Sequence, residues 1–275
     1  MVAHRLQVPN VRLAVETNDG KPSVAFIHGF GGNLRTWNPI WDILPNERSY
    51  LRYDLRGFGE SIALSDKSFR HVDDLLALLE LLSIERCDLV GVSMGGSIAI
   101  HFALEYPEHV RSLSLISPGL TAWEWSDAWR ALRQPIVAAA REGRMQDARA
   151  LWLAHPLFET TRMSAAAAML AEEIAAFSGA QWVEDHEMPA LPDVDRLHLL
   201  DLPILLLTGG RDFSDFRLIA DLIEAAAPDV SRYDEPALGH LLHIESPAEC
   251  CERLTRFWRG LDTGNRLLAR LSPDE

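Results

Sequence analysis

The sequence predicts an α/β fold, in which a mostly parallel sheet carries helices on both faces. Three observations predict it. Short β-rich runs alternate with helical patterns over the first half of the chain, the alternation stops near Gly119, and it resumes at Pro203. Strands that alternate with helices pair in parallel through crossover connections, which cover both faces of the sheet. We therefore expect one doubly wound sheet, interrupted by an insertion of a different kind.

The elements before the insertion follow from the spacing of apolar residues. A turn signal at 18–20 separates the first two of the predicted strands, and a glycine-rich loop follows the second. A short helix carries Trp37 and Trp41, apolar residues at helical spacing predict a helix over 72–82, and another helix is predicted over 94–106. The runs that predict strands are 11–16, 23–27, 49–54, 87–92 and 110–117.

The middle third of the chain has no strand pattern. Alanine, arginine, glutamate and tryptophan dominate it, and residues 164–177 form a strong helix by propensity. After it, strands are predicted at 204–209 and 230–234 and helices at 216–227 and 247–261. We therefore predict a core domain formed by residues 1–118 and 201–262, a helical insertion over 119–200, and a loosely ordered tail over 263–275.

The composition excludes several classes of protein. The chain has 275 residues, of which 48% are hydrophobic and 24% charged, as in ordinary globular proteins. Its 26 basic and 40 acidic residues give a net charge of −14, which disfavours nucleic-acid binding. The N-terminal segment lacks the continuous apolar run of a secretion signal, and no apolar stretch approaches the ~20 residues of a membrane helix.

The cysteine content indicates a compartment. Only three cysteines are present, Cys87 alone and Cys250 next to Cys251, which is no disulfide framework and favours a reducing environment. We expect a cytoplasmic protein that binds a small molecule, as a monomer or homodimer, with no nucleic-acid or membrane partner.

The most specific motif is Gly91-Val92-Ser93-Met94-Gly95-Gly96. A predicted strand precedes it and a predicted helix follows, which is the context of a G-x-S-x-G turn that presents a serine hydroxyl at the carboxyl edge of a sheet. The glycines remove side chains that would clash in so sharp a turn. The alternative, a tight glycine turn with an incidental serine, fits this context poorly. We expect Ser93 to be a nucleophile.

A serine hydroxyl needs a base to remove its proton and a carboxylate to orient that base. Asp212 follows a predicted strand almost directly, and His240 lies on the loop beyond the next strand. Both side chains would therefore reach the sheet edge that carries Ser93. The chain order serine, acid, histidine is also the order expected for this type of turn.

Each assignment has a rival nearby in the sequence. Asp215 could replace Asp212, although it lies further from the strand, and His243 could replace His240, although a hydrogen-bonded structural role in the core fits His243 better. The cluster His240-x-x-His243-x-Glu245 could also suggest metal ligands. It lacks the H-E-x-x-H spacing and a further ligand, so we expect no metal.

Taken together, these motifs resemble the α/β-hydrolase superfamily. The resemblance covers about residues 11–258, except in the insertion, where it is only positional. It implies an α/β-hydrolase fold with a helical cap over 119–200, inserted after the sixth strand and lying over the nucleophile. The matching residues are Ser93, Asp212, His28-Gly29-Phe30-Gly31-Gly32, Asp54-Leu55-Arg56-Gly57-Phe58-Gly59-Glu60-Ser61, and Gly239-His240 with Glu245-Ser246-Pro247.

The resemblance also implies an oxyanion hole, formed by the backbone N–H groups of Phe30 and Met94. The alternative for the loop at His28 is a phosphate loop, but the Lys-Ser/Thr of a P-loop and the G-x-G-x-x-G of a dinucleotide site are both missing. The turn that contains Arg56 would support the floor of the site, with Arg56 in an ion pair with a nearby acid.

The tryptophans of the insertion are the candidate pocket residues. Trp123, Trp125 and Trp129 follow soon after the strand that ends at Ser117. Clustered tryptophans give apolar walls with occasional N–H donors, which suits an acyl or alicyclic substrate. They would either roof the substrate pocket or pack the cap onto the core, and the sequence leaves both alternatives open.

A serine nucleophile argues against the haloalkane dehalogenases and epoxide hydrolases of this superfamily, which use aspartate at that position. The resemblance therefore implies a cofactor-free serine hydrolase that cleaves a carboxylic ester or lactone of a small, largely apolar substrate. The alternatives are a C–C bond hydrolase of ring-cleavage diketones, a non-hydrolytic lyase and a noncatalytic binding protein. A complete nucleophile, acid, base and oxyanion loop disfavours the last, because binding alone does not require all four.

Overall fold

A nine-stranded sheet forms the centre of the molecule in the computed structural model, which describes residues 2–18 and 20–264. The strand order is β1-β2-β4-β3-β6-β7-β8-β9, with β5 paired to β2. The run from β4 to β9 is parallel throughout, whereas β1, β2 and β5 form an antiparallel edge. The strands are β1 (Val2–Val8), β2 (Val11–Thr17), β3 (Val24–Ile27), β4 (Tyr50–Tyr53), β5 (Ile62–Ala63), β6 (Cys87–Val92), β7 (Val110–Ile116), β8 (Ile204–Gly209) and β9 (Val230–Glu235).

The α/β prediction is confirmed, and two strands were missed at the antiparallel edge. β1 pairs with β2 over its whole length, and its exposed and half-buried pattern gives the sequence no apolar run. β5 has two exposed residues, too few to produce a pattern. Because β1 and β5 add to the five strands predicted before it, the helical insertion follows the seventh strand rather than the sixth. The expected turn at 18–20 includes residue 19, which lies outside the described residues, as does most of the predicted tail.

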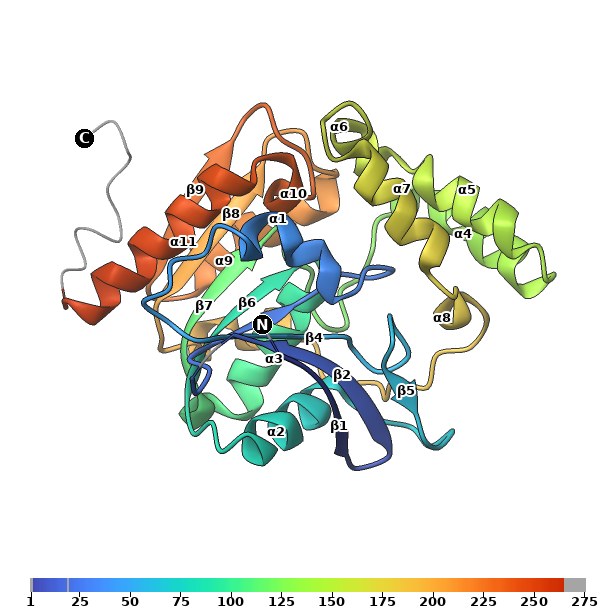
Figure 1. The fold of residues 1–275 in the computed structure, drawn as a ribbon. Coiled ribbons are helices and arrows are strands. Elements are labelled where there is room, and N and C mark those ends of the chain that lie inside the picture. Colours follow the sequence, from blue (N-terminus) through green and yellow to red (C-terminus); the bar gives the residue numbers. More distant parts are fainter. Residues whose placement is uncertain (1, 19, 265–275) are drawn as a thin grey trace.

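The central strands are apolar because both of their faces are covered. Every residue of β3, β6 and β8 is buried, which explains why apolar residues predominate in these strands. On one face α1 (Asn38–Trp41), α10 (Leu242–Glu245) and α11 (Pro247–Asp262) pack together. On the other, α2 (His71–Leu81) packs on α3 (Met94–Glu105), and the 3₁₀ segment Asp193–Leu199 contacts both α3 and α9 (Ser214–Ala226). Figure 1 shows this layered arrangement.

The insertion is helical in the described structure and stands to one side of the sheet (Figure 1). Its helices pack on one another, with α4 against α5 and α8, and α7 against α5 and α6. The helix predicted over 164–177 begins later in the structure, at Ala167, and ends at Ala176. It is shorter because the Ser164 side chain bonds the backbone of the turn that precedes it. The helices are α4 (Asp127–Arg141), α5 (Met145–Leu153), α6 (Glu159–Arg162), α7 (Ala167–Ala176) and α8 (Ala180–Val183).

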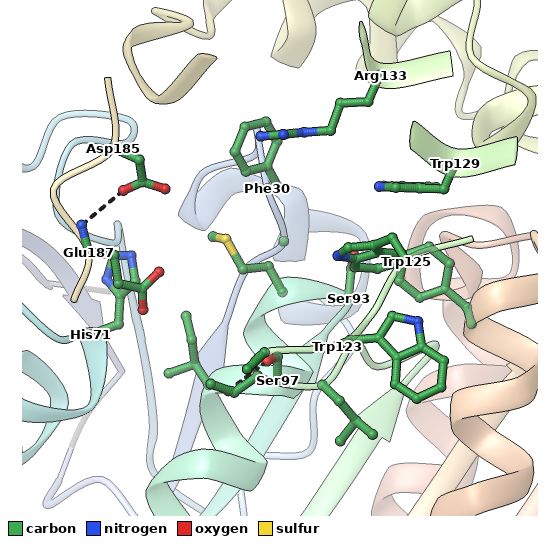
Figure 2. A pocket seen from close by; sticks show the side chains of 18 of the residues that line it. Phe30, His71, Ser93, Ser97, Trp123, Trp125, Trp129, Arg133, Asp185 and Glu187 are labelled. Atoms are coloured by element: carbon green, nitrogen blue, oxygen red, sulfur yellow. Dashed lines mark hydrogen bonds between the residues drawn. The ribbon is translucent and has the colours of Figure 1, made fainter. Parts of the chain in front are cut away.

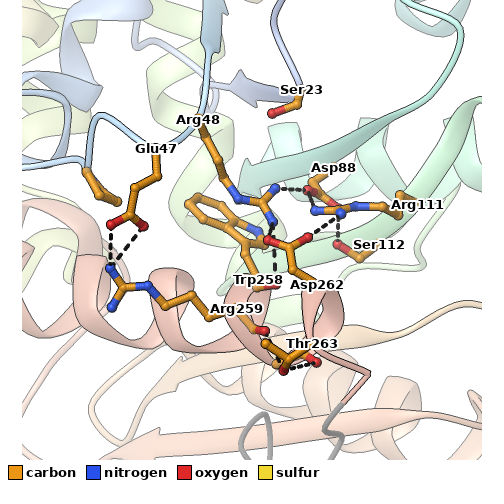
Figure 3. A network of polar contacts seen from close by, with 12 residues as sticks. Ser23, Glu47, Arg48, Asp88, Arg111, Ser112, Trp258, Arg259, Asp262 and Thr263 are labelled. Atoms are coloured by element: carbon orange, nitrogen blue, oxygen red, sulfur yellow. Dashed lines mark hydrogen bonds and ion pairs between the residues drawn. The ribbon is translucent and has the colours of Figure 1, made fainter.

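A polar cluster holds α11 to the amino-terminal ends of β6 and β7 (Figure 3). The Asp88 carboxylate is fully buried and accepts hydrogen bonds from Arg48 Nη1 at 2.9 Å, Arg111 Nε at 2.8 Å and the Ser112 hydroxyl at 2.6 Å. Both arginines also pair with Asp262 at the end of α11. A buried carboxylate is tolerated only when it is paired and hydrogen-bonded. The cluster therefore fixes the last helix at the end of the sheet opposite to Ser93.

Among the described residues no helix is long and apolar enough to cross a lipid bilayer.

The carboxyl group of Glu173 is buried where α7 meets the core. Glu173 Oε1 is buried without a hydrogen-bond partner in the described structure. The carboxyl lies beside Thr36, whose hydroxyl oxygen contacts His243 Nε2 at 2.9 Å. Burial raises the pKa of Glu173 to about 8, against the opposing effect of the Thr36 hydroxyl. The carboxyl is therefore protonated in the folded protein at a pH where it is ionised in the unfolded chain.

This shift predicts a pH-dependent stability. Between the ordinary glutamate pKa and about 8 the folded state binds one proton more than the unfolded state, so Glu173 makes stability fall as the pH rises through this window. Glu173→Gln keeps the shape of the neutral acid but cannot ionise. We expect Glu173→Gln to leave the melting temperature unchanged near pH 4 and to raise it progressively up to pH 8. A difference that does not change with pH would contradict the shifted pKa.

Candidate active site

The turn at Ser93 joins β6 to α3 in a backbone conformation that side chains rarely adopt. Ser93 has φ = 54°, and its backbone is held from three sides. Its N–H donates to Ile116 at 3.0 Å, and its carbonyl accepts from Ser97 at 3.1 Å and from Gly119 at 2.9 Å. The conformation therefore belongs to a rigid turn at the carboxyl edge of the sheet, where the hydroxyl faces the cavity described below.

Glycine is required around this turn by the close approach of backbone. A Cβ at Gly91 would overlap the carbonyl of Gly95, and a Cβ at Gly95 would overlap the carbonyl of Ile27 at the end of β3. A Cβ at Gly96 would lie 2.7 Å from Pro118 Cβ. The G-x-S-x-G motif is thus explained by three backbone segments that meet at one point.

The residues predicted as acid and base, Asp212 and His240, lie on the loops that follow β8 and β9. Both carboxylate oxygens of Asp212 are 3.0 Å from His240 Nδ1, and both side chains are buried. An ionised carboxylate accepts the proton of Nδ1, which leaves Nε2 as the basic nitrogen. Nε2 makes no hydrogen bond within the described residues, and His240 lines the same cavity as Ser93. The geometry can thus orient a neutral imidazole as a general base.

The rival residues have other partners. Asp215 accepts from the backbone N–H and the hydroxyl of Ser126, at 2.8 and 2.7 Å, and so ties the start of α4 to α9. His243 is fully buried, contacts Thr36 through Nε2, and burial lowers its pKa to about 3. Within the described residues no group of three or more histidine, cysteine, aspartate or glutamate side chains could hold a metal ion.

The loop that carries Phe30 is shaped by His28. Nε2 of His28 accepts the N–H of Leu55 at 3.0 Å, so Nδ1 carries the proton and donates to the Gly29 carbonyl at 2.8 Å. Burial lowers the pKa of His28 and keeps it neutral. The loop passes so close to the nucleophile that a Cβ at Gly29 would lie 3.3 Å from Ser93 Cβ.

Phe30 directly follows Gly29 in this loop, and Met94 directly follows Ser93. Because Met94 is the first residue of α3, its N–H has no acceptor within the helix. Both residues line the cavity, and amide donors at a helix start favour a developing negative charge. The arrangement is suited to binding an oxyanion.

The turn after β4 supports this loop. Asp54 accepts the N–H groups of Leu34 at 2.6 Å and Glu60 at 2.7 Å, and so joins the two glycine-rich segments. Arg56 forms a buried ion pair with Asp74, as expected, rather than facing the cavity.

A cavity of about 1150 Å³ opens above Ser93, between the sheet and the helical insertion. Trp123, Trp125 and Trp129 line it, so the structure places all three at the pocket (Figure 2). Trp125 also stacks on Trp129, with the ring centroids 4.5 Å apart, and both rings contact Phe216 of α9. Trp125 and Trp129 thus line the cavity and also pack the start of the insertion onto α9.

The cavity also contains charged residues that no sequence motif marks. Arg133 of α4 extends over it, and Asp185, Glu187 and His71 lie on the side away from the tryptophans in Figure 2. The Glu187 side chain opens to the cavity, yet the surrounding protein atoms raise its pKa to about 7. Burial lowers the pKa of His71 to about 3. Burial also lowers the pKa of Arg133. One end of the cavity is therefore apolar and the other polar.

Comparison with known proteins assigns this chain to a family. A family model described as alpha/beta hydrolase fold matches residues 22–150. A Bacillus subtilis (strain 168) protein with the name "Putative 2-succinyl-6-hydroxy-2,4-cyclohexadiene-1-carboxylate synthase" is 30% identical over 86% of this chain and 91% of its own length.

Solved structures show the same fold. MenH from S. aureus superposes with a TM-score of 0.77 and 20% identity, over 90% of this chain and 98% of that chain. The enol-lactonase from Burkholderia xenovorans LB400 superposes with a TM-score of 0.75 and 20% identity, over 90% and 97%.

The contrast between the two aspartates gives a testable prediction. Asp212→Asn should lower kcat by about 10⁴-fold, because an amide in place of the carboxylate favours the wrong imidazole tautomer. Asp215→Asn is the matched control, and we expect it to change kcat little, since Asp215 bonds Ser126 instead. Kinetics of both variants on one substrate that the wild-type protein turns over would check this. A larger loss from Asp215→Asn would reassign the acid.

The packing around the nucleophile turn gives a second prediction. Gly95→Ala should destabilise the protein by about 3 kcal/mol, because the new methyl group meets backbone that cannot move aside. Gly119→Ala is the control, since its nearest heavy atoms would be 3.7 Å away. Urea unfolding of both variants measures the difference, and equal stabilities would refute the close-approach explanation.

Proposed function

The chain is an enzyme of the α/β hydrolase fold family, and we propose that it is a serine hydrolase that cleaves a carboxylic ester or lactone. The observation that carries the proposal is the convergence of three groups at one cavity. Ser93 lies in a turn with a positive φ, the His240 ring is held by Asp212, and Phe30 and Met94, whose N–H groups we propose as the oxyanion hole, line the same cavity. Such a set is needed for acyl transfer and not for binding alone.

The reaction follows from the positions of these groups. His240 Nε2 takes the proton of Ser93 as the oxygen attacks the substrate carbonyl carbon, and the Phe30 and Met94 N–H groups hold the oxyanion. The tetrahedral species then expels the alcohol oxygen, which takes that proton from His240, and an acyl-serine remains. Water attacks the acyl group with His240 again as base, releasing the acid and restoring Ser93. The Asp212 carboxylate stabilises the imidazolium in both halves.

The cavity supports a substrate with one apolar and one polar part. Its tryptophan wall suits a ring or a branched acyl chain next to the scissile carbonyl. Arg133, Asp185 and Glu187 at the other end suit hydrogen-bonding groups on the same molecule. The volume, about 1150 Å³, exceeds the usual range for drug-sized ligands and leaves room for water or a larger substrate.

A second candidate is a non-hydrolytic lyase reaction that uses the same base. The relative from Bacillus subtilis is named as a synthase of a ring carboxylate rather than as a hydrolase, and its similarity extends over 86% of this chain. The Arg133 guanidinium at the cavity would suit a carboxylate on such a substrate. For either reaction we propose a cytoplasmic location, which is supported by three buried cysteines that are all free thiols.

Hydrolysis of p-nitrophenyl acetate, butyrate and octanoate tests the first candidate. We expect turnover by the wild-type protein and a loss of at least about 10³-fold in Ser93→Ala, because the attacking oxygen is removed while the fold is kept. The dependence of kcat/KM on chain length measures the apolar end of the cavity.

The negative outcomes separate the alternatives. No turnover of any ester, together with covalent labelling of Ser93 by a fluorophosphonate, would contradict the esterase proposal and favour the lyase. Absence of labelling in a folded protein would contradict both and leave a binding role.

A further inference from the structure

Glu245 has no part in the reaction described above, yet it connects two regions that the reaction needs. It lies in α10, five residues after His240, within the motif that the sequence shares with its family. Its Oε2 accepts the backbone N–H of Gly239 at 2.6 Å, and its Oε1 accepts the hydroxyl of Thr161 in α6. One carboxylate thus joins the helical insertion to the loop that carries the base.

The contact between α6 and this loop is tight. Thr161 is fully buried, and a Cβ at Gly239 would lie 2.7 Å from the Thr160 hydroxyl oxygen, so the insertion leaves no room for a side chain there. Glu245 is only half-buried and could reach solvent if α6 moved away. The carboxylate is therefore bound on both oxygens only while α6 rests on the loop.

The position of His240 depends on this loop. The backbone N–H of Arg211, next to Asp212, donates to the Leu238 carbonyl at 2.9 Å. This bond ties the loop, just before His240, to the segment that carries Asp212. Gly239, immediately before His240, is held by Glu245. A displacement of about 1 Å at the base is enough to cost roughly 100-fold in rate, so a bond one residue away can control the reaction.

We propose that Glu245 is a positioning residue that couples the seating of the helical insertion, through Thr161, to the placement of the His240 base. This inference rests on the proposed function only in taking His240 as the base for Ser93. Contact with α6 keeps Glu245 on Gly239, and loss of that contact loosens the loop. The insertion would in this way affect the rate of the chemical step as well as forming the cavity.

The experiment measures the reactivity of Ser93 rather than turnover of one substrate. Wild type, Glu245→Ala, Glu245→Gln and Thr161→Val are labelled with a fluorophosphonate, and the maximal labelling rate is separated from the probe affinity. Hydrogen exchange of the peptide that contains Gly239 is measured in the same proteins. Glu252→Ala, which removes an exposed carboxylate from α11, is the matched control.

We expect Glu245→Ala to lower the maximal labelling rate roughly 10- to 100-fold with unchanged probe affinity, and to speed exchange at Gly239. Glu245→Gln should retain most of the rate, because its amide oxygen can accept from Gly239 while its NH₂ group donates to Thr161. Thr161→Val should show a smaller loss of the same kind, and this loss should disappear in the Glu245→Ala background.

Three results would overturn the proposal. These are a wild-type labelling rate in Glu245→Ala, an equal loss in Glu245→Gln, or a Thr161→Val loss that adds in full to that of Glu245→Ala. If Glu245→Ala fails to fold, Thr161→Val with its exchange measurement decides alone. A wild-type protein that does not label at all would refute the proposed function, while unchanged exchange at Gly239 in the variants would separately refute the Glu245 contact.

Discussion

The close approach of three backbone segments at Ser93 is the constraint on which the rest of the structure depends. The end of β3, the start of α3 and the segment after β7 meet so tightly that Gly91, Gly95 and Gly96 have no room for a side chain. This contact forces Ser93 into a positive φ and holds its hydroxyl away from the sheet. It also brings the His28 loop beside Ser93, so that one packing arrangement fixes the positions of both Ser93 and the loop that carries Phe30.

The polar groups around this point show how partners, rather than residue type, decide a role. Asp212 and Asp215 are three residues apart, but one orients an imidazole and the other anchors the first helix of the insertion. His240 and His243 are equally close in sequence. One keeps a free Nε2 at the cavity, and the other lies in the core against Thr36. A buried polar atom needs a partner, and the partner it finds determines whether it is available for chemistry.

Much of the fold was predictable because the parallel strands are continuous apolar runs and the glycine motifs need a specific turn. The candidate triad could be proposed from Ser93, Asp212 and His240 for the same reason: each follows a recognisable strand. β1 could not be predicted, because an edge strand exposed on one side carries no continuous apolar signal. Arg133 and Glu187 could not be predicted either, because they come to line one cavity only through the packing of the insertion, which has no local motif.

The position of the insertion has a consequence for how this enzyme can change over evolutionary time. Residues 119–200 enter after β7 and leave before β8, so they interrupt no strand and carry none of Ser93, Asp212 or His240. Substitutions there can reshape the cavity while Ser93, Asp212 and His240 stay in place. Substrate specificity can therefore change while the reaction type is kept. Several contacts limit this freedom. Ser126, Thr161 and Arg196 of the insertion bond the core carboxylates of Asp215, Glu245 and Glu105, respectively. A replacement insertion would have to offer matching polar groups at these points, so such contacts define where one module of this kind can be exchanged for another.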